Sequence, residues 1–229
     1  MKRNIVNDKI TVSGNPRYDR ILNNLENVEY KLDSSRQEEG NILIFASMWD
    51  ADNKIIFEKF INSPLVNHFE KVIIVPHEVT DYHLNYYCTL MENNDLFFKK
   101  ISQYQNCNQF EEKYVIVNKV GFLSKLYAQS TIAYVGGGFS KSGIHNIIEP
   151  AAASNPVIFG SNFLNSNKSD AEGLIDISGG FCVDSYKLFT EKINWLLDKN
   201  NYNNSSKNCK SFVTENSGST EKILKGLYE

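Results

Sequence analysis

The stretch that decides the fold is Ile132–Gly160, which reads IAYVGGGFSKSGIHNIIEPAAASNPVIFG. An apolar run, Ile132–Gly136, leads into three glycines, and a second apolar run closes the stretch. Between the two runs lies a polar loop. It is followed by a segment that is typical of a helix beginning near His145 or Asn146 and carrying Glu149 in its first turns. This order of strand, glycine loop, helix and strand predicts a parallel βαβ unit.

Similar apolar runs recur on both sides of this unit, and they are nearly continuous in hydrophobicity. That pattern favours strands that are buried on both faces of a parallel sheet. The predicted strands are Ile10–Ser13, Ile42–Ala46, Val72–Val75, Tyr114–Val117, Ile132–Gly136, Val157–Phe159 and Phe181–Val183. Amphipathic segments predict helices at Ala51–Ile61, Leu123–Ala128, Ser185–Asp198 and Thr214–Tyr228. The alternation predicts an α/β fold with one Rossmann-like, doubly wound parallel sheet, in a single domain spanning residues 1–229.

Two segments interrupt the pattern, and both are predicted to be irregular. Lys31–Gly40 is polar and charged, and it leads into the strand at Ile42. Asn200–Asn208 is rich in Asn and Ser, which predicts a loop between two late helices.

Composition excludes several classes of protein. The formal net charge of -3 shows no basic excess for nucleic acid. The four cysteines form no C-x-x-C pair, so we expect free thiols and no zinc site. The first residues have no apolar secretory core, and no apolar run approaches the ~18 residues of a membrane span. We therefore expect a cytoplasmic protein that binds no metal.

The glycine segment suits an anionic ligand. Glycines at a strand end, Gly137 and Gly138 among them, let backbone N–H groups approach a phosphate without hindrance from Cβ atoms. A helix beginning near Asn146 adds unpaired N–H donors. Glu149 would then accept hydrogen bonds from the hydroxyls of a ribose. The alternative is a simple tight turn with a solvated Glu149. Neither the P-loop pattern nor G-x-G-x-x-G is present, so a nicotinamide or flavin cofactor is not expected.

These residues carry a family resemblance. The run GGGFSKSGIHNIIEPA at Gly136–Ala151 resembles the donor-site signature of the 3-deoxy-D-manno-octulosonic acid (Kdo) transferases. Four other segments are similar to this family in the same order, over about Lys9 to Val183. They are VSGNPRYDRI at Val12–Ile21, IFASMWDAD at Ile44–Asp52, IIVPHE at Ile73–Glu78 and VGFLSKLY at Val120–Tyr127.

The resemblance implies the carboxyl-terminal half of a GT-B glycosyltransferase, an enzyme of lipopolysaccharide synthesis. It implies CMP-Kdo as donor substrate, a lipid A precursor as acceptor, and inverting transfer without metal or cofactor. It also implies peripheral association with the inner face of the bacterial inner membrane. Positions that contact CMP in the family fall on Pro76, His77, Val120, Gly121, Phe122, Asn146, Ile147, Ile148 and Glu149, beside Gly137 and Gly138 of the glycine loop.

Four further residues are predicted to support this site. Arg17 and Lys141 are candidate counter-charges for the sugar carboxylate or the departing phosphate. Their alternatives are pairing of Arg17 with Asp19 or a neighbouring helix, and a solvated loop lysine. His145 is expected to orient the loop, and the alternative is direct contact with the phosphate. Ser47 falls in a turn where the family has Gly-Ser-Thr and this chain has Ala-Ser-Met.

The match begins where the second domain of the family begins. The first domain, which carries the catalytic glutamate of the family, is therefore expected to lie outside this chain. We accordingly expect no catalytic residue here, and an isolated chain that binds nucleotide without transferring sugar. The alternatives are a free-standing nucleotide-sugar-binding module and a GT-B transferase or epimerase that uses UDP-sugars.

Overall fold

The computed structural model describes residues 10–26, 40–103, 111–163 and 167–228. Its centre is a seven-stranded, wholly parallel sheet with the order β3-β4-β2-β1-β5-β6-β7. The strands are β1 (Ile42–Met48), β2 (Lys71–Pro76), β3 (Phe98–Lys100), β4 (Tyr114–Ile116), β5 (Ile132–Val135), β6 (Val157–Gly160) and β7 (Gly180–Val183).

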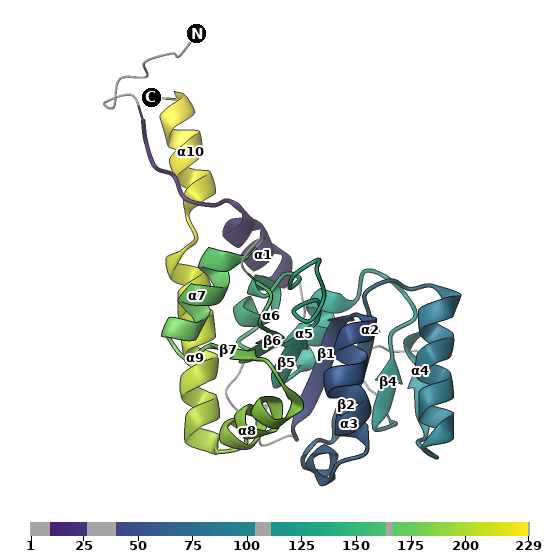
Figure 1. Cartoon of the computed structure of the whole chain (residues 1–229). Coiled ribbons are helices and arrows are strands. Elements are labelled where there is room, and N and C mark those ends of the chain that lie inside the picture. The colour runs from purple at the N-terminus through teal and green to yellow at the C-terminus, as the bar shows by residue number, and fades with distance from the viewer. Residues whose placement is uncertain (1–9, 27–39, 104–110, 164–166, 229) are drawn as a thin grey trace.

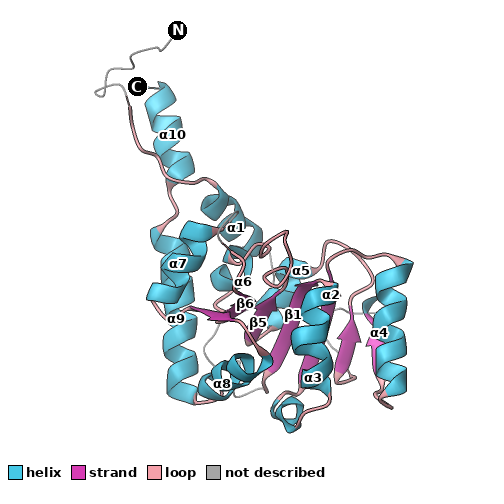
Figure 2. Ribbon diagram, in the orientation of Figure 1, coloured by secondary structure: helices cyan, strands magenta, loops and turns pink. Residues whose placement is uncertain are grey.

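Helices cover both faces of the sheet, as Figures 1 and 2 show. The longer helices are α1 (Arg17–Glu26), α4 (Asp81–Asn93), α5 (Leu123–Gln129), α7 (Lys168–Asp176), α8 (Tyr186–Leu196), α9 (Lys199–Glu215) and α10 (Ser219–Tyr228). The short ones are α2 (Asp50–Asp52), the π-helical η3 (Asn53–Phe57), α3 (Glu58–Ile61), the 3-10 turns η4 (Pro64–His68) and η5 (Ile101–Gln103), and α6 (Ile148–Ala152).

Alternate residues of the strands face two separate cores. Ile44 and Ala46 of β1 pack into one core with α1, α5, α6, α7 and α9. Leu43 and Phe45 of the same strand pack into the other core with the α2–α3 segment, α4 and α8. Burial on both faces is what the continuous apolar runs predicted, so the doubly wound α/β fold is confirmed.

The order of the strands creates a topological switch point between β1 and β5. From β1 the chain moves outward to β2, and later it returns to β5 on the other side of β1. The loops that follow β1 and β5 therefore diverge at the carboxyl edge. Such a switch point is where open parallel sheets bind their ligands.

Three predictions of secondary structure are wrong. Ile10–Ser13 forms no strand, and Val12 is 87% exposed, because a short apolar run without a strand neighbour cannot join the sheet. Asn200–Asn208 lies inside α9, which buries Tyr202 and Cys209 and begins at an Asp198 cap. Burial of one helix face outweighs the low helix propensity of Asn and Ser. The third error is the start of the helix after the glycine loop, which begins at Ile148 and not at His145 or Asn146.

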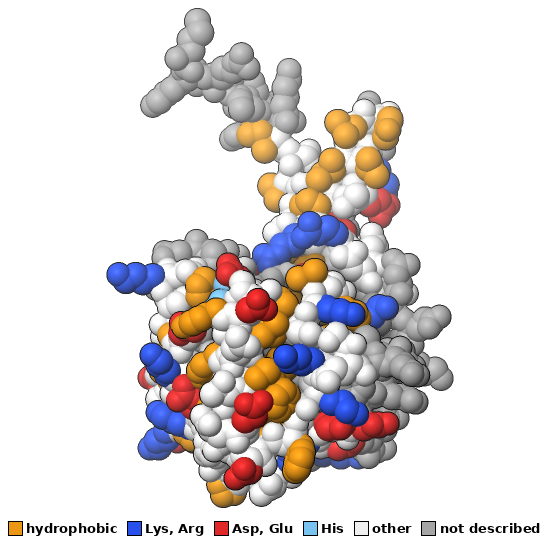
Figure 3. Space-filling view, turned by 90° about the vertical axis from the view of Figure 1, so that its right-hand side faces the viewer, with side chains coloured by type: hydrophobic (Ala, Val, Ile, Leu, Met, Phe, Trp, Pro, Cys, Tyr) orange, Lys and Arg blue, Asp and Glu red, His pale blue; other side chains and the backbone are white. Residues whose placement is uncertain are grey.

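The predicted loop Lys31–Gly40 lies outside the described residues except for Gly40. The carboxyl-terminal helix is confirmed as α10, which projects away from the body (Figure 1). Its apolar side chains, Ile223, Leu224, Leu227 and Tyr228, are exposed, and orange side chains mark this projection in Figure 3. Asp19 of α1 accepts hydrogen bonds from the backbone N–H groups of Gly218 and Thr220, and so ties the start of α10 to the body.

Candidate functional site

Three loops meet at the carboxyl edge of the central strands. The N–H of His77, just beyond β2, donates to the carbonyl of Met48 at 3.0 Å. The N–H of Gly136, just beyond β5, donates to the carbonyl of Ala46 at 2.8 Å. The loops after β2 and β5 are therefore both held against the end of β1. The sequence prediction that Pro76-His77 and the glycine segment share one edge agrees with this geometry.

The three glycines are required by the close approach of the chain to itself. A Cβ atom on Gly136 would lie within 3.0 Å of the Ser47 backbone, and one on Gly138 would collide with the backbone of Gly160. Gly137 has a φ of +98°, and its Cβ would collide with the carbonyl of Gly143. Internal packing therefore explains these glycines. Approach of a ligand, the reason expected from the sequence, is a separate requirement and stays a prediction.

A buried carboxylate, Asp52, supports the glycine loop from below. It accepts hydrogen bonds from the Tyr134 hydroxyl at 2.6 Å, the Gly137 N–H at 2.9 Å and the Trp49 N–H at 3.3 Å. Burial raises the pKa of Asp52, although its hydrogen bonds to Tyr134 and Gly137 oppose that shift. Because the Gly137 N–H is already satisfied, it is not a free donor for a phosphate. Asp52 thus joins the glycine loop to Tyr134 of β5 and to the start of α2.

The rings of Trp49, His77 and His145 form a cluster next to the glycine loop. The Trp49 indole stacks on the His77 imidazole with 3.8 Å between ring centroids, and its Nε1–H donates to Nε2 of His145 at 2.9 Å. The two histidine rings lie 4.4 Å apart, centroid to centroid. Burial lowers the pKa of both histidines, and the nearby His77 adds to the effect at His145. Both rings therefore favour the neutral form.

A second network surrounds Glu149 in the first turn of α6. Asn146 accepts from the N–H of Ile148 at 3.1 Å and donates through Nδ2 to Oε1 of Glu149 at 2.7 Å. The predicted N-cap position of Asn146 is wrong, because the five-residue helix has Ile147 as its N-cap, and Asn146 instead forms an Asx turn one residue before it. Glu149 also lines a small pocket with Ser124 of α5 and Leu25 of α1. The half-exposed carboxylate therefore faces the gap between α1, α5 and α6.

Arg17 reaches the same network from α1. Its guanidinium donates to the side-chain oxygen of Asn146, lies 3.4 Å from Asp170 and donates to Asn167. Arg17 therefore pairs with a neighbouring helix, through Asp170 of α7, as one alternative predicted. It does not pair with Asp19, which instead accepts hydrogen bonds from the start of α10. Arg17 positions Asn146, and its charge is largely balanced within the chain.

The other predicted residues lie on the loops at this edge. Val120 is 83% exposed, Gly121 has a φ of +89°, and Phe122 packs on the core at the start of α5. Ile147 and Ile148 are fully buried and hold α6 in place. Ser47 has a φ of +54° at an irregularity in β1, so the turn is strained as a non-glycine residue there. Lys141 is exposed on the glycine loop, His68 lies in η4, and His83 lies in α4.

Sequence reasoning missed Trp49 and Asp52. Both belong to the IFASMWDAD segment, but their partners are far away in the sequence. Trp49 contacts a side chain 96 positions away, and Asp52 contacts one 82 positions away. A tryptophan and an acid directly after a buried strand were the available signal, since that position faces the ligand edge of a parallel sheet.

Two features are absent from the described residues. Among them, no three His, Cys, Asp or Glu side chains gather as a metal site would require. None of the described helices is long and apolar enough to cross a bilayer.

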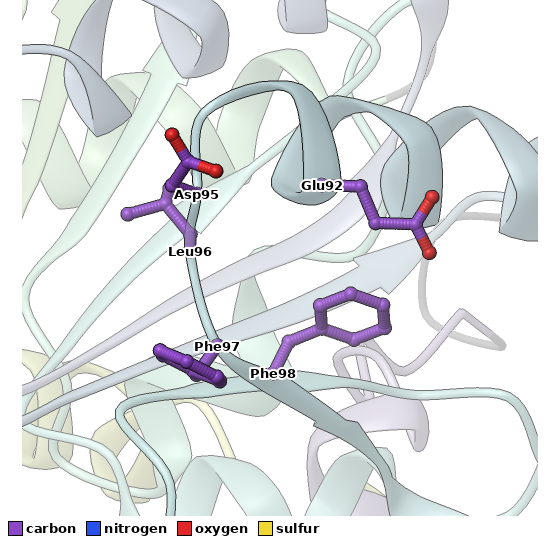
Figure 4. A pocket seen from close by; sticks show the side chains of 5 residues that line it. All are labelled: Glu92, Asp95, Leu96, Phe97 and Phe98. Atoms are coloured by element: carbon purple, nitrogen blue, oxygen red, sulfur yellow. The ribbon is translucent and has the colours of Figure 1, made fainter.

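A separate hollow lies beside the edge strand β3, at the side of the sheet far from the glycine loop. Phe97 is 89% exposed there, near Glu92 and Asp95 (Figure 4). None of the residues predicted for the site lines it.

Comparison with known proteins shows that the chain is similar to several glycosyltransferases. No family model matches it. It is 28% identical to a 3-deoxy-D-manno-octulosonic acid transferase from Chlamydia trachomatis serovar D, over 98% of this chain and 52% of that protein. It is also 28% identical to a bifunctional glycosyltransferase/methyltransferase from Fusobacterium nucleatum, over 92% of this chain and 32% of that protein. The chain thus spans about half the length of the first relative and a third of the second.

Solved structures agree on the fold. The carboxyl-terminal CMP-Kdo-binding domain of WaaA from Acinetobacter baumannii superposes with a TM-score of 0.63 at 17% identity, over 86% of this chain and 98% of that domain. A glycosyltransferase from Rickettsia africae gives a TM-score of 0.56 at 18% identity, over 98% of this chain and 57% of that one. The chain is therefore similar to the 3-deoxy-D-manno-octulosonic acid transferases, and it has the carboxyl-terminal domain fold of the GT-B glycosyltransferases.

Proposed function

We propose that this chain binds CMP-Kdo as the donor half of an inverting glycosyltransferase that needs no metal or cofactor. The acceptor would be a lipid A precursor of lipopolysaccharide synthesis. One observation carries the proposal. Similarity to Kdo transferases over 98% of the chain coincides with the meeting of Pro76-His77, the glycine loop and Asn146–Glu149 at the switch point of the sheet.

The ribose and base of the nucleotide would lie between α5 and α6. Oε1 of Glu149 is already engaged by Asn146, so Oε2 is the oxygen available to a ribose hydroxyl. Asn146 is in turn held by Arg17, so the carboxylate is fixed before a ligand arrives. Gly121 and Phe122, which immediately precede α5, would border the cytosine.

The phosphate and sugar would lie over the glycine loop. Because Asp52 occupies the N–H of Gly137 and Asp170 balances Arg17, other groups must meet the anion. We assign this task to the exposed Lys141, to His145 and to the N–H groups of Asn146 and Ile147. Neither N–H has a partner among the described residues. Such donors would stabilise the departing phosphate by about 3 kcal/mol or more.

In the transfer, an acceptor hydroxyl oxygen attacks the anomeric carbon of Kdo from the face opposite the phosphate. The bond from that carbon to the phosphate oxygen breaks, CMP leaves with the electron pair, and the hydroxyl proton passes to a general base. We propose that the base belongs to an acceptor-binding half outside these 229 residues. That half would also account for peripheral association with the inner membrane. The isolated chain would then bind donor and transfer nothing.

Calorimetry with CMP, UMP and UDP tests the donor assignment. We expect CMP to bind best, and Glu149→Gln to weaken it roughly 10- to 100-fold, because one charge-assisted hydrogen bond to the ribose is lost. Gln keeps an oxygen that can accept from Asn146, so the network survives. The matched control is Glu172→Gln, on the exposed face of α7, which should leave affinity unchanged. Preference for UDP would refute the CMP-Kdo assignment and favour a UDP-sugar enzyme.

A transfer assay separates an enzyme half from a free-standing binding module. The substrates are CMP-Kdo and a lipid A precursor, incubated with the chain alone or with the amino-terminal half of a Kdo transferase. We expect turnover only in the second case. Turnover by the chain alone would contradict the assignment of the base, and CMP binding without turnover in either case would favour the module.

A further inference from the structure

The hydrogen bond between Trp49 and His145 determines which nitrogen of the His145 ring carries the proton. The indole Nε1–H of Trp49 points at Nε2 of His145 over 2.9 Å, and an indole nitrogen can only donate. Nε2 of His145 must therefore carry a lone pair. In a neutral imidazole the proton then resides on Nδ1.

The surroundings of His145 also oppose a second proton. Protonating Nε2 would set two N–H groups against each other and would break the Trp49 bond. The ring of His77 lies beside it, so a charge on either ring disfavours a charge on the other. Glu78 raises the pKa of His77, and His83 lowers it. The carboxylate of Asp52 accepts a hydrogen bond from the backbone N–H of Trp49. The exposed Lys141 is the nearest cation along the same loop.

Nδ1 of His145 has no hydrogen-bond partner among the described residues. Its own backbone N–H is used, because it donates to the carbonyl of Gly136 at 3.2 Å. The carbonyl of His145 accepts from Asn167. The backbone of this residue is thus fixed on both sides, and Nδ1–H is left as an oriented, uncharged donor beside the glycine loop.

We propose that Trp49 is a positioning residue that holds His145 in the neutral Nδ1–H form, so that Nδ1 donates a hydrogen bond to the phosphate of the bound nucleotide. The part concerning phosphate rests on the proposed nucleotide site, whereas the part concerning the tautomer does not. A neutral donor keeps one protonation state across the range in which a free histidine loses its proton, so the protein adds no pH dependence of its own to phosphate binding. It also releases CMP without a proton transfer.

Nitrogen NMR of the histidine rings tests the tautomer directly in the ligand-free chain. The signals of His145 are assigned with His145→Gln. We expect a pyridine-type shift for Nε2 and a pyrrole-type shift for Nδ1, unchanged from pH 8 to pH 6. In Trp49→Phe the stack remains but the donor is lost, so His145 should mix tautomers and titrate. A pyrrole-type Nε2 in the wild-type chain, or identical spectra in the two proteins, would overturn the proposal.

Addition of CMP and of cytidine tests the phosphate contact. CMP should shift Nδ1 of His145, and cytidine, which lacks the phosphate, should not. Trp49→Phe should weaken CMP about 2- to 10-fold, the range of one neutral hydrogen bond. Ionisation of the CMP phosphate makes the affinity of both proteins depend on pH, and titration of His145 should add a further dependence in the variant. If calorimetry shows CMP bound while Nδ1 does not respond, the phosphate role is refuted and the nucleotide site stands. If CMP does not bind, the proposed function and the phosphate role fail together, and the ligand-free spectrum still decides the tautomer.

Discussion

Removal of the Asp52 carboxylate should strongly destabilise the chain, because this buried group holds the glycine loop at the carboxyl edge of the sheet. Asp52 is fully buried and accepts from Tyr134, Gly137 and Trp49. In Asp52→Ala, the Tyr134 hydroxyl and the Gly137 N–H would be left buried without an acceptor. Each unpaired donor costs about 1–3 kcal/mol. Relief of the cost of burying the carboxylate offsets part of this loss. We therefore expect a net loss of about 2–4 kcal/mol in the free energy of unfolding.

A double-mutant cycle with Tyr134→Phe isolates the strongest contact. Tyr134→Phe alone should cost about 1–2 kcal/mol, because it removes one hydrogen bond and keeps the ring. In the double variant no hydroxyl is left unpaired, so the total should fall short of the sum by about 1 kcal/mol or more. Thr214→Ala, which removes an exposed hydroxyl from α9, serves as a control with an effect near zero.

Urea unfolding followed by circular dichroism measures these differences, provided that the denaturant slope stays constant among the variants. A loss below about 1 kcal/mol for Asp52→Ala, or costs that add within about 0.5 kcal/mol, would refute the account of this network. The glycine loop would then have to be held by backbone packing alone.

Two further predictions concern the backbone and a helix cap. Gly138→Ala should reduce the free energy of unfolding in urea by about 2 kcal/mol or more, because its Cβ meets the backbone of Gly160. The control, Gly226→Ala in α10, has open space around it and should stabilise the chain slightly. Equal effects of the two substitutions would contradict the packing argument. Hydrogen bonds from the start of α10 lower the pKa of Asp19 below its ordinary value of 3.8, so its contribution is complete above that pH and is lost as pH falls through the lowered pKa. Asp19→Ala should therefore reduce the helicity of α10, seen in its 13Cα shifts, at pH 7, and this difference should shrink as the pH falls through the lowered pKa. A difference that does not change with pH would refute the role of the carboxylate.

The fold followed from the sequence wherever burial was strong and local. The apolar runs of β1, β2, β5 and β6 lie in the middle of the sheet, where both faces are covered, and each was predicted from hydrophobicity alone. The edge strand β3, Phe98–Lys100, is only half-buried and was missed. Its position depends on pairing with β4, which no local pattern announces. The course of α9 through Asn200–Asn208 likewise depended on the core it covers.

The site was predictable in its outline and not in its contacts. Motif order placed Pro76-His77 and Asn146–Glu149 at one edge, since parallel strands bring their carboxyl ends together. The pairing of Arg17 with Asp170, and the bond from Trp49 to His145, join residues that only the folded sheet brings near. The need for the glycines in contacts within the chain likewise depends on the folded sheet, whereas their approach to a ligand stays a prediction.

Backbone amide NMR with added CMP tests the central claim most directly. The account predicts shift changes in the loops at the carboxyl edge, at His77, Gly121, Phe122 and Asn146–Glu149, with little change in α4 or α10. No response to CMP, or a response confined to the hollow around Phe97 at the far edge of the sheet, would contradict a nucleotide site at the switch point.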